Sequence, residues 1–175
     1  MSADVRFLSP AGLSKPTGYS HVVAASGGTT VYISGQVAFN AAGNVVGEGD
    51  HQRQAEQVFA NLQLALASVG ADFEHVVKVT YFVVGLNRDV TLMLREVRAG
   101  YLSAERPPAS TLVAVAGLVD PRLLIEVEAI AVIPINEYST AASVSTQRAS
   151  AATTGIAVAG EGFDQQHRAI GGRGV

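Results

Sequence analysis

The sequence predicts an α+β fold, a mixed β-sheet with two helices packed on one of its faces. The expected elements run in the order strands, helix, strand, helix and two strands along 175 residues. Two segments carry apolar residues at helical spacing, and the segments around them are rich in β-branched residues. Helices on one side of a single sheet bury that side, so this order predicts two layers.

Three short strands are expected before the first helix, over residues 5–8, 19–25 and 30–39. Gly27-Gly28 predicts a tight hairpin turn with positive φ angles between the second and third of these strands. Gly35 interrupts the third strand, which often marks a β-bulge or a close approach of the backbone to another group.

The first helix is expected over residues 50–69, with Asp50 as its N-cap and Gly70 at its end. One stripe of this helix is apolar, with its members at helical spacing: Ala55, Val58, Phe59, Leu62, Leu66 and Val69. A neighbouring polar strip is expected to be a solvated face and consists of Gln54, Gln57 and Asn61.

Residues 76–84 form a strand that is apolar on both faces apart from Lys78 and Thr80, which is typical of a central strand or one covered twice. A second helix is expected from Asn87 or Asp89 to about residue 102. Pro107-Pro108 then prevents any continuation of that helix.

The stretch 106–134 is interpreted as two strands joined by a short turn. The second of these strands is apolar except for Glu126 and Glu128, which are two residues apart and so point to the same face. Carboxylates in an apolar strand need partners or a pocket, because desolvating an unpaired charge is costly. This pair is the first candidate for a functional site.

Composition narrows the class of protein. The chain is 48% hydrophobic and 15% charged, its net charge is −3, and its basic residues form no stripe, so a nucleic-acid partner is not expected. The absence of cysteine excludes disulfides and thiolate catalysis and is compatible with the cytoplasm. The sequence shows no signal peptide and no apolar run of membrane-spanning length. No histidine spacing indicates a metal site, and no cofactor is expected.

The domain organisation expected from composition is one domain over residues 1–136 and an Ala/Ser/Gly-rich tail over residues 137–175. The tail has few large apolar residues, so we expect it to be flexible or only partly ordered. In the domain, the sheet face opposite the helices carries many apolar residues, which predicts self-association.

Several segments taken together resemble the RidA/YjgF family of small trimeric proteins, and the match covers about residues 5–134. The matching segments are Gly18-Tyr19-Ser20-His21, Val31-Tyr32-Ile33-Ser34-Gly35-Gln36, the side chains Gln54, Gln57 and Asn61, Val76-Val77-Lys78-Val79-Thr80, Pro108-Ala109-Ser110-Thr111 and Ile125-Glu126-Val127-Glu128-Ala129-Ile130-Ala131.

The resemblance implies a chorismate-mutase-like fold and a homotrimer with a central barrel of sheets. It also implies ligand clefts between subunits, which bind a small carboxylated or carbonyl-containing metabolite. In the best-known branch of the family, the clefts hydrolyse enamines and imines to a 2-oxo acid and ammonia.

The same resemblance assigns roles to individual residues. Glu126 matches the glutamate that positions water, and Tyr19 and Gly35 match residues that line the cleft. The family arginine that holds the substrate carboxylate follows a Pro-Ala dipeptide, and here Ser110 occupies that position. A serine supplies no charge, and charge-assisted hydrogen bonds are about twice as strong as neutral ones.

The missing arginine leaves two interpretations open: a deaminase-type hydrolase with altered substrate choice, or a metabolite-binding or regulatory trimer without catalysis. Arg106 or Arg122 could reach the same cleft from nearby loops, although a solvated loop arginine is the simpler interpretation of each. Ser110 could bind the ligand or simply belong to its strand. Glu128 is expected to be structural, at the trimer contact.

Overall fold

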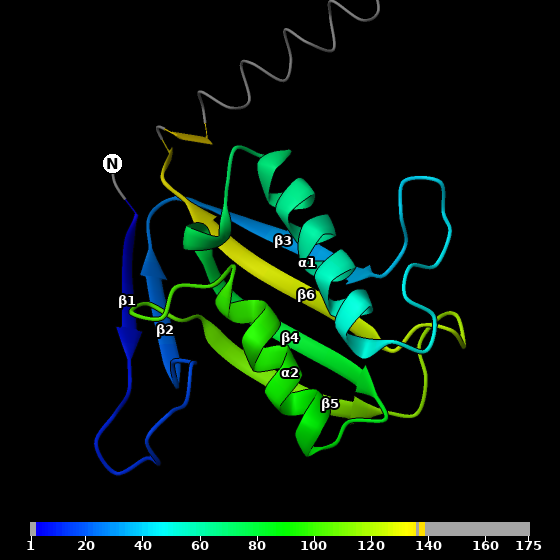
Figure 1. The fold of residues 1–175 in the computed structure, drawn as a ribbon. Helices are drawn as coiled ribbons and strands as arrows, with labels where there is room; N and C mark the ends of the chain where they lie inside the picture. The colour runs from blue at the N-terminus through cyan, green and yellow to red at the C-terminus, as the bar shows by residue number, and fades with distance from the viewer. Residues whose placement is uncertain (1–2, 136, 139–175) are drawn as a thin grey trace, which may run out of the picture. The chain divides into compact units, whose positions relative to one another are not determined.

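The computed structural model of the protein describes residues 3–135 and 137–138, which lie within the first of two compact units, residues 1–142 (Figure 1). Its elements are β1 (Asp4–Leu8), β2 (Val22–Ser26), β3 (Thr29–Val37), α1 (His51–Ala67), the 3₁₀ turn η1 (Phe73–His75), β4 (Val76–Val84), α2 (Arg88–Ala99), β5 (Ala109–Val115) and β6 (Ile125–Ile133). The predicted α+β class is confirmed. The expectation for the tail falls almost wholly on residues outside this description.

The main sheet has the strand order β3-β6-β4-β5, in which β4 is antiparallel to β6 and parallel to β5. The expected central position of the strand over residues 76–84 is therefore confirmed, and the sheet is mixed. The strands predicted in the stretch 106–134 are both present, but β4 separates them, so they do not pair with each other.

The predicted hairpin across Gly27-Gly28 is wrong. Both glycines have positive φ angles, 69° and 83°, as expected. However, β2 pairs with β1 in a separate two-stranded sheet, and β3 pairs with β6. The glycine pair therefore turns the chain from one sheet into the other, because a local turn signal does not determine which strands pair.

Both helices cover the same face of the main sheet, as Figure 1 shows. The side chain of Asp50 caps α1 by accepting from the amides of Gln52 (3.0 Å) and Arg53 (3.1 Å), and Asn87 caps α2 by accepting from the amide of Val90 (3.0 Å). Between helices and sheet lies the core, whose largest fully buried members include Phe59, Leu62, Leu66, Leu123, Ile125, Ile133, Val79, Val83 and Val127.

The polar strip of α1 is not the solvated face that we expected. Gln54 is fully buried, and its side chain donates to the carbonyls of Gly47 (3.1 Å) and Arg122 (2.8 Å) and accepts from the amide of Leu124 (2.7 Å). Asn61 donates to the carbonyls of Val37 and Phe39, both at 2.9 Å, and accepts from Gln57. These amides hold the end of β3, the loop after it and the loop before β6, because buried backbone groups need partners.

The other face of the main sheet has no helix over it. Alternation along β6 directs Glu126 and Glu128 to this face, which confirms that the two carboxylates point the same way. Tyr32 on β3 also lies on this face with 78% of its surface exposed, and Val113 on β5 has 38% exposed. We call this surface the open face.

Candidate functional site

Glu126 and Gly35 lie against each other on the open face. The pairing of β3 with β6 is irregular between Ile33 and Gln36, so the predicted bulge at Gly35 is confirmed. A Cβ atom built on Gly35 would lie 2.6 Å from Cδ of Glu126 and closer still to its Oε1. The glycine thus leaves the space that the glutamate side chain fills.

The two glutamates of β6 differ in their surroundings. Within the part of the chain that the structure describes, the Glu126 carboxylate makes no hydrogen bond or ion pair, and the residue is half-buried. Glu128 is exposed and lies near Lys78, whose pKa burial lowers while the Glu128 carboxylate opposes that shift. Glu128 also makes no hydrogen bond or ion pair within the described residues, so what distinguishes Glu126 is its half-buried position against Gly35, where it can act on a ligand or a water molecule.

Ser110 is on the opposite face of the sheet from Glu126. In the register, Ser110 pairs with Val79, which is buried beneath the helices, whereas Glu126 pairs with Phe82 on the open face. Paired residues on adjacent strands point to the same side of a sheet. Within one chain, Ser110 and Glu126 therefore cannot contact the same small molecule through their side chains.

Tyr19 lies beside the start of β5. Its neighbour Ser20 forms a parallel bridge with Ala109, and its hydroxyl donates to the carbonyl of Pro107 at 2.7 Å. The half-buried ring of Tyr19 packs edge-on against His21, with a centroid distance of 5.3 Å. Tyr19 and Ser110 are thus the chain neighbours of two residues that pair with each other. The structure therefore forms two groups of predicted site residues, Tyr19 with Ser110 and Gly35 with Glu126.

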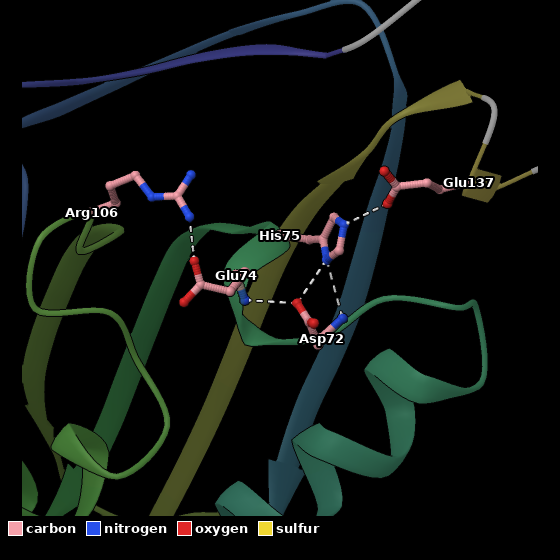
Figure 2. Close-up of polar contacts among 5 residues, drawn as sticks. All are labelled: Asp72, Glu74, His75, Arg106 and Glu137. Carbon is pink, nitrogen blue, oxygen red and sulfur yellow. Dashed lines mark hydrogen bonds and ion pairs between the residues drawn. The ribbon is translucent and has the colours of Figure 1, made fainter.

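Arg106 lies apart from both Glu126 and Ser110, beside Glu74 in the turn before β4. Figure 2 shows its guanidinium pointing to Glu74, with which it forms an ion pair. Both residues line a hollow of about 300 Å³ whose wall includes Val5, Phe7 and Val132. Arg122 is also paired, because Asp120 accepts from its guanidinium at 2.7 Å, and these hydrogen bonds lower the pKa of Asp120 to about 2.

His75, beside this hollow, connects two chain segments. Its Nδ1 lies 2.8 Å from Oδ1 of Asp72 and its Nε2 lies 3.2 Å from a carboxylate oxygen of Glu137 (Figure 2). These contacts join the turn before β4 to the segment after β6. No group of three or more histidine, aspartate or glutamate side chains in the described residues is arranged to hold a metal ion.

On the helix side of the sheet, two arginines of α2 face the segment before β2. Arg95 donates to the hydroxyl of Thr17 and Arg98 donates to its carbonyl, both at 3.2 Å. Beneath them, the phenol of Tyr81 is buried and makes no hydrogen bond of ordinary geometry within the described chain. Burial raises the pKa of Tyr81 to about 12, and the positive charge of Arg98 opposes that shift.

Comparison with known proteins gives the family. Residues 12–133 match the family described as Endoribonuclease L-PSP. The chain is 37% identical over 115 residues to protein DfrA of Myxococcus xanthus, covering 65% of this chain and 84% of that protein. The solved structure of a Rid family protein from Yersinia pestis has a TM-score of 0.67 and 35% identity, covering 74% of this chain and 98% of that one. The chain belongs to the RidA/YjgF family.

One further relative is named for an activity. Over 60 residues the chain is 37% identical to the 2-iminobutanoate/2-iminopropanoate deaminase of Dermatophagoides farinae, a match that covers 34% of this chain and 47% of that protein. No helix in the described part of this RidA/YjgF chain is long and apolar enough to cross a membrane.

Sequence reasoning on this RidA/YjgF protein singled out Glu126 and Gly35, which the structure brings together, but it did not single out the arginines of α2. Glu126 interrupts an apolar strand and Gly35 interrupts a β-branched one, so each stands out against its immediate neighbours in the sequence. Arg95 and Arg98 occur on an exposed helix stretch and contact Thr17, about eighty positions earlier in the chain. Their only signal in the sequence is two arginines three residues apart on one helix, a spacing that places them on the same face.

Proposed function

We propose that this protein binds a small carboxylated or carbonyl-containing metabolite in clefts between the subunits of a homotrimer and hydrolyses an enamine or imine there. The products are a 2-oxo compound and ammonia. Glu126 positions and deprotonates the attacking water. The observation that carries this proposal is the Glu126 carboxylate, which lies unpaired among the described residues against Gly35 on the open face.

The proposed chemistry needs one carboxylate and one water molecule. An enamine first tautomerises to the imine. Glu126 accepts a proton from water while the water oxygen bonds to the imine carbon, and the protonated Glu126 then gives that proton to the nitrogen and becomes a carboxylate again. The resulting carbinolamine loses ammonia and leaves a carbonyl group, so no redox step and no cofactor are needed. Gly35 gives the carboxylate the room to take this position.

The positions of Ser110 and Glu126 on opposite faces support an intersubunit cleft. A site that uses both side chains requires Glu126 from one chain and Ser110 from another, since one chain cannot bring them together. The exposed aromatic and aliphatic groups of the open face, Tyr32 and Val113, favour assembly for the separate reason that exposed apolar surface is stabilised by burial. The clefts and the trimer thus depend on each other in this proposal.

A second candidate is a metabolite-binding or regulatory trimer without catalysis. Ser110 favours it, because a neutral hydroxyl stands where the family carries the arginine that holds the substrate carboxylate. Without that charge the family's usual substrate would bind more weakly. The family description also names an endoribonuclease activity, but a net charge of −3 without a basic stripe gives little attraction for RNA.

The test is a coupled assay with a threonine or serine dehydratase, in which semicarbazide traps the imine before it hydrolyses. Full-length protein should accelerate loss of the imine, and Glu126→Gln should abolish the acceleration. Glu128→Gln is the matched control, because it removes the same charge from the same strand and face. Ser110→Arg should increase the rate if the missing charge limits substrate binding.

Each outcome separates the candidates. No acceleration by the wild-type protein, together with saturable binding of a 2-oxo acid, would support the non-catalytic trimer and reject hydrolysis of these imines. Acceleration that survives in Glu126→Gln would reject the role given to that residue. Cleavage of single-stranded RNA that depends on Glu126 would replace the metabolite proposal altogether.

A further inference from the structure

A hollow of about 370 Å³ lies between the second half of α2 and the segment before β2. Its polar wall includes Thr17, Arg95 and Arg98, and its apolar wall includes Ala99, Leu102 and Ala104. This volume is at the lower end of the range for ligand pockets, about 300–1,000 Å³, which suits a small molecule. The hollow is thus polar on one side and apolar on the other.

The two arginines of this hollow are not neutralised by any described carboxylate. Each donates a hydrogen bond to a neutral oxygen of Thr17. Arg106 and Arg122, the two arginines that sequence reasoning suggested for ligand binding, instead form ion pairs with Glu74 and Asp120. Since a guanidinium has five N–H donors, Arg95 and Arg98 keep donors available for another acceptor.

Neighbouring residues fix the position of Arg98. A Cβ atom on Gly18 would lie 2.6 Å from Nη2 of Arg98, so the glycine makes room for the guanidinium. Gly18 has a φ of 76°, which favours glycine at this turn. On its other side Arg98 lies near the buried phenol of Tyr81. A guanidinium held in this way loses less entropy when it binds an anion.

We propose that Arg95 and Arg98 form the carboxylate-binding site of this protein and that the site takes a small monocarboxylate with a short apolar tail. The guanidinium groups bind the planar carboxylate, and the Thr17 hydroxyl adds a hydrogen bond. The tail packs on Leu102 and Ala104. This inference deepens the proposed function, on which it rests for the carboxylate of the ligand.

The hollow is close to the position where the family carries its arginine. Thr17 is three residues before Ser20, which bridges to Ala109, the neighbour of Ser110. Three residues of extended chain span roughly 10 Å. Ser110 also points to the helix side of the sheet, the side on which α2 lies. The α2 arginines can therefore supply the positive charge that Ser110 lacks.

The test measures binding to full-length protein by isothermal titration calorimetry, with 2-oxobutanoate as the probe. Butan-2-one, which lacks the carboxylate, and inorganic phosphate are the comparison probes. We expect 2-oxobutanoate to bind, butan-2-one not to bind, and phosphate to bind at least about tenfold more weakly than the carboxylate because it cannot use the apolar wall. Phosphate binding as tightly as 2-oxobutanoate would overturn the monocarboxylate assignment.

Substitutions assign the binding to the two side chains. Arg98→Gln should weaken binding about ten- to a hundredfold, and Arg95→Gln/Arg98→Gln should abolish it, because hydrogen bonds to charged groups are lost. Arg88→Gln is the matched control, since it removes one charge from the exposed first turn of the same helix outside the hollow. Equal weakening by Arg88→Gln would reduce the effect to net charge and overturn the proposal.

A measurement on the unaltered protein avoids any folding defect of the variants. Phenylglyoxal modifies exposed arginines, and mass spectrometry locates the adducts. 2-Oxobutanoate should protect Arg95 and Arg98 but leave Arg88 reactive. Absence of protection, or absence of 2-oxobutanoate binding by the wild-type protein, would overturn the inference.

Failure of this inference is distinguishable from failure of the proposed hydrolysis. Binding that depends on Arg98, without acceleration of imine loss, would keep the carboxylate site and reject the enzyme. Hydrolysis with an unchanged KM in the double arginine variant would keep the enzyme and reject the site.

Discussion

The side chain of Glu126 occupies the space above Gly35 that any larger residue at position 35 would fill. The contact joins the β-bulge of β3 to the start of β6, and it involves the half-buried one of the two carboxylates of that strand. Gly35 does not have a positive φ angle, so its value here is the absence of a side chain rather than a special backbone conformation.

Gly35→Ala should therefore destabilise the protein more when Glu126 is present than when it is absent. We expect a loss of about 1–3 kcal/mol in the free energy of unfolding, because the added methyl group overpacks against the glutamate. In a Glu126→Ala background the same substitution should cost much less. Urea unfolding of the four proteins gives the coupling free energy. An equal cost in both backgrounds would mean that position 35 needs glycine for the backbone alone.

Gln54→Ala should be among the most destabilising substitutions of a polar residue in this protein. The buried amide serves two carbonyls and one amide from the loops around it, and its loss leaves these backbone groups without partners. An unsatisfied buried group costs about 1–3 kcal/mol, so we expect a loss of at least about 2 kcal/mol in urea unfolding. Gln63→Ala, on the exposed side of α1, should change stability by less than about 0.5 kcal/mol.

Gly35 and Gln54 show which structural features could be predicted from the sequence and which could not. Asp50, Asn87 and the bulge at Gly35 were predictable because caps and strand interruptions act within a few residues of their own position. The common direction of Glu126 and Glu128 follows from strand alternation alone. The burial of Gln54 was missed, because its partners come from loops as far as seventy residues away, and a polar side chain on a helix gives no sign of them.

The prediction that β2 pairs with β3 was wrong for a related reason. Gly27-Gly28 correctly indicated positive φ angles, but pairing with β1 rather than β3 depends on the whole arrangement of strands. The candidate carboxylate site was missed because Arg98 and Thr17 are 81 residues apart in sequence. Family resemblance supplied the role proposed for Glu126. It could not indicate which residue would replace the family arginine, because this chain departs from the family at Ser110.

Tyr81→Phe should make the protein less sensitive to alkaline pH. The pKa of Tyr81 is raised by burial to about 12 from an ordinary value of 10, so the folded state keeps the proton longer than the unfolded state. Titration of Tyr81 therefore does not affect stability below about pH 10, and it lowers the free energy of unfolding as the pH rises from about 10 to 12, by an amount on the order of 2 kcal/mol. Urea unfolding at pH 8 and pH 11 should show a larger fall for the wild type than for the variant.

At neutral pH the same substitution should leave stability unchanged or slightly increased. The Tyr81 hydroxyl is buried without a hydrogen bond of ordinary geometry in the described chain, so its removal relieves a desolvation cost. A loss of more than about 1 kcal/mol at pH 8 would show instead that the phenol stabilises Arg98 through their close approach.

Sedimentation should find the wild-type protein as an assembly of three times the chain mass of 18.1 kDa. Val113→Asp should shift it toward the monomer, because a carboxylate on the open face would have to be desolvated next to Phe82 and near Glu126 when the faces meet. Leu64→Asp is the matched control on α1, where the side chain is 71% exposed on the helix layer, and it should leave the assembly intact. A monomeric wild type would reject the trimer. Dissociation by Leu64→Asp but not by Val113→Asp would place the contact on the helices instead of the open face, and Glu126 would then lie too far from the contact to complete a neighbour's cleft.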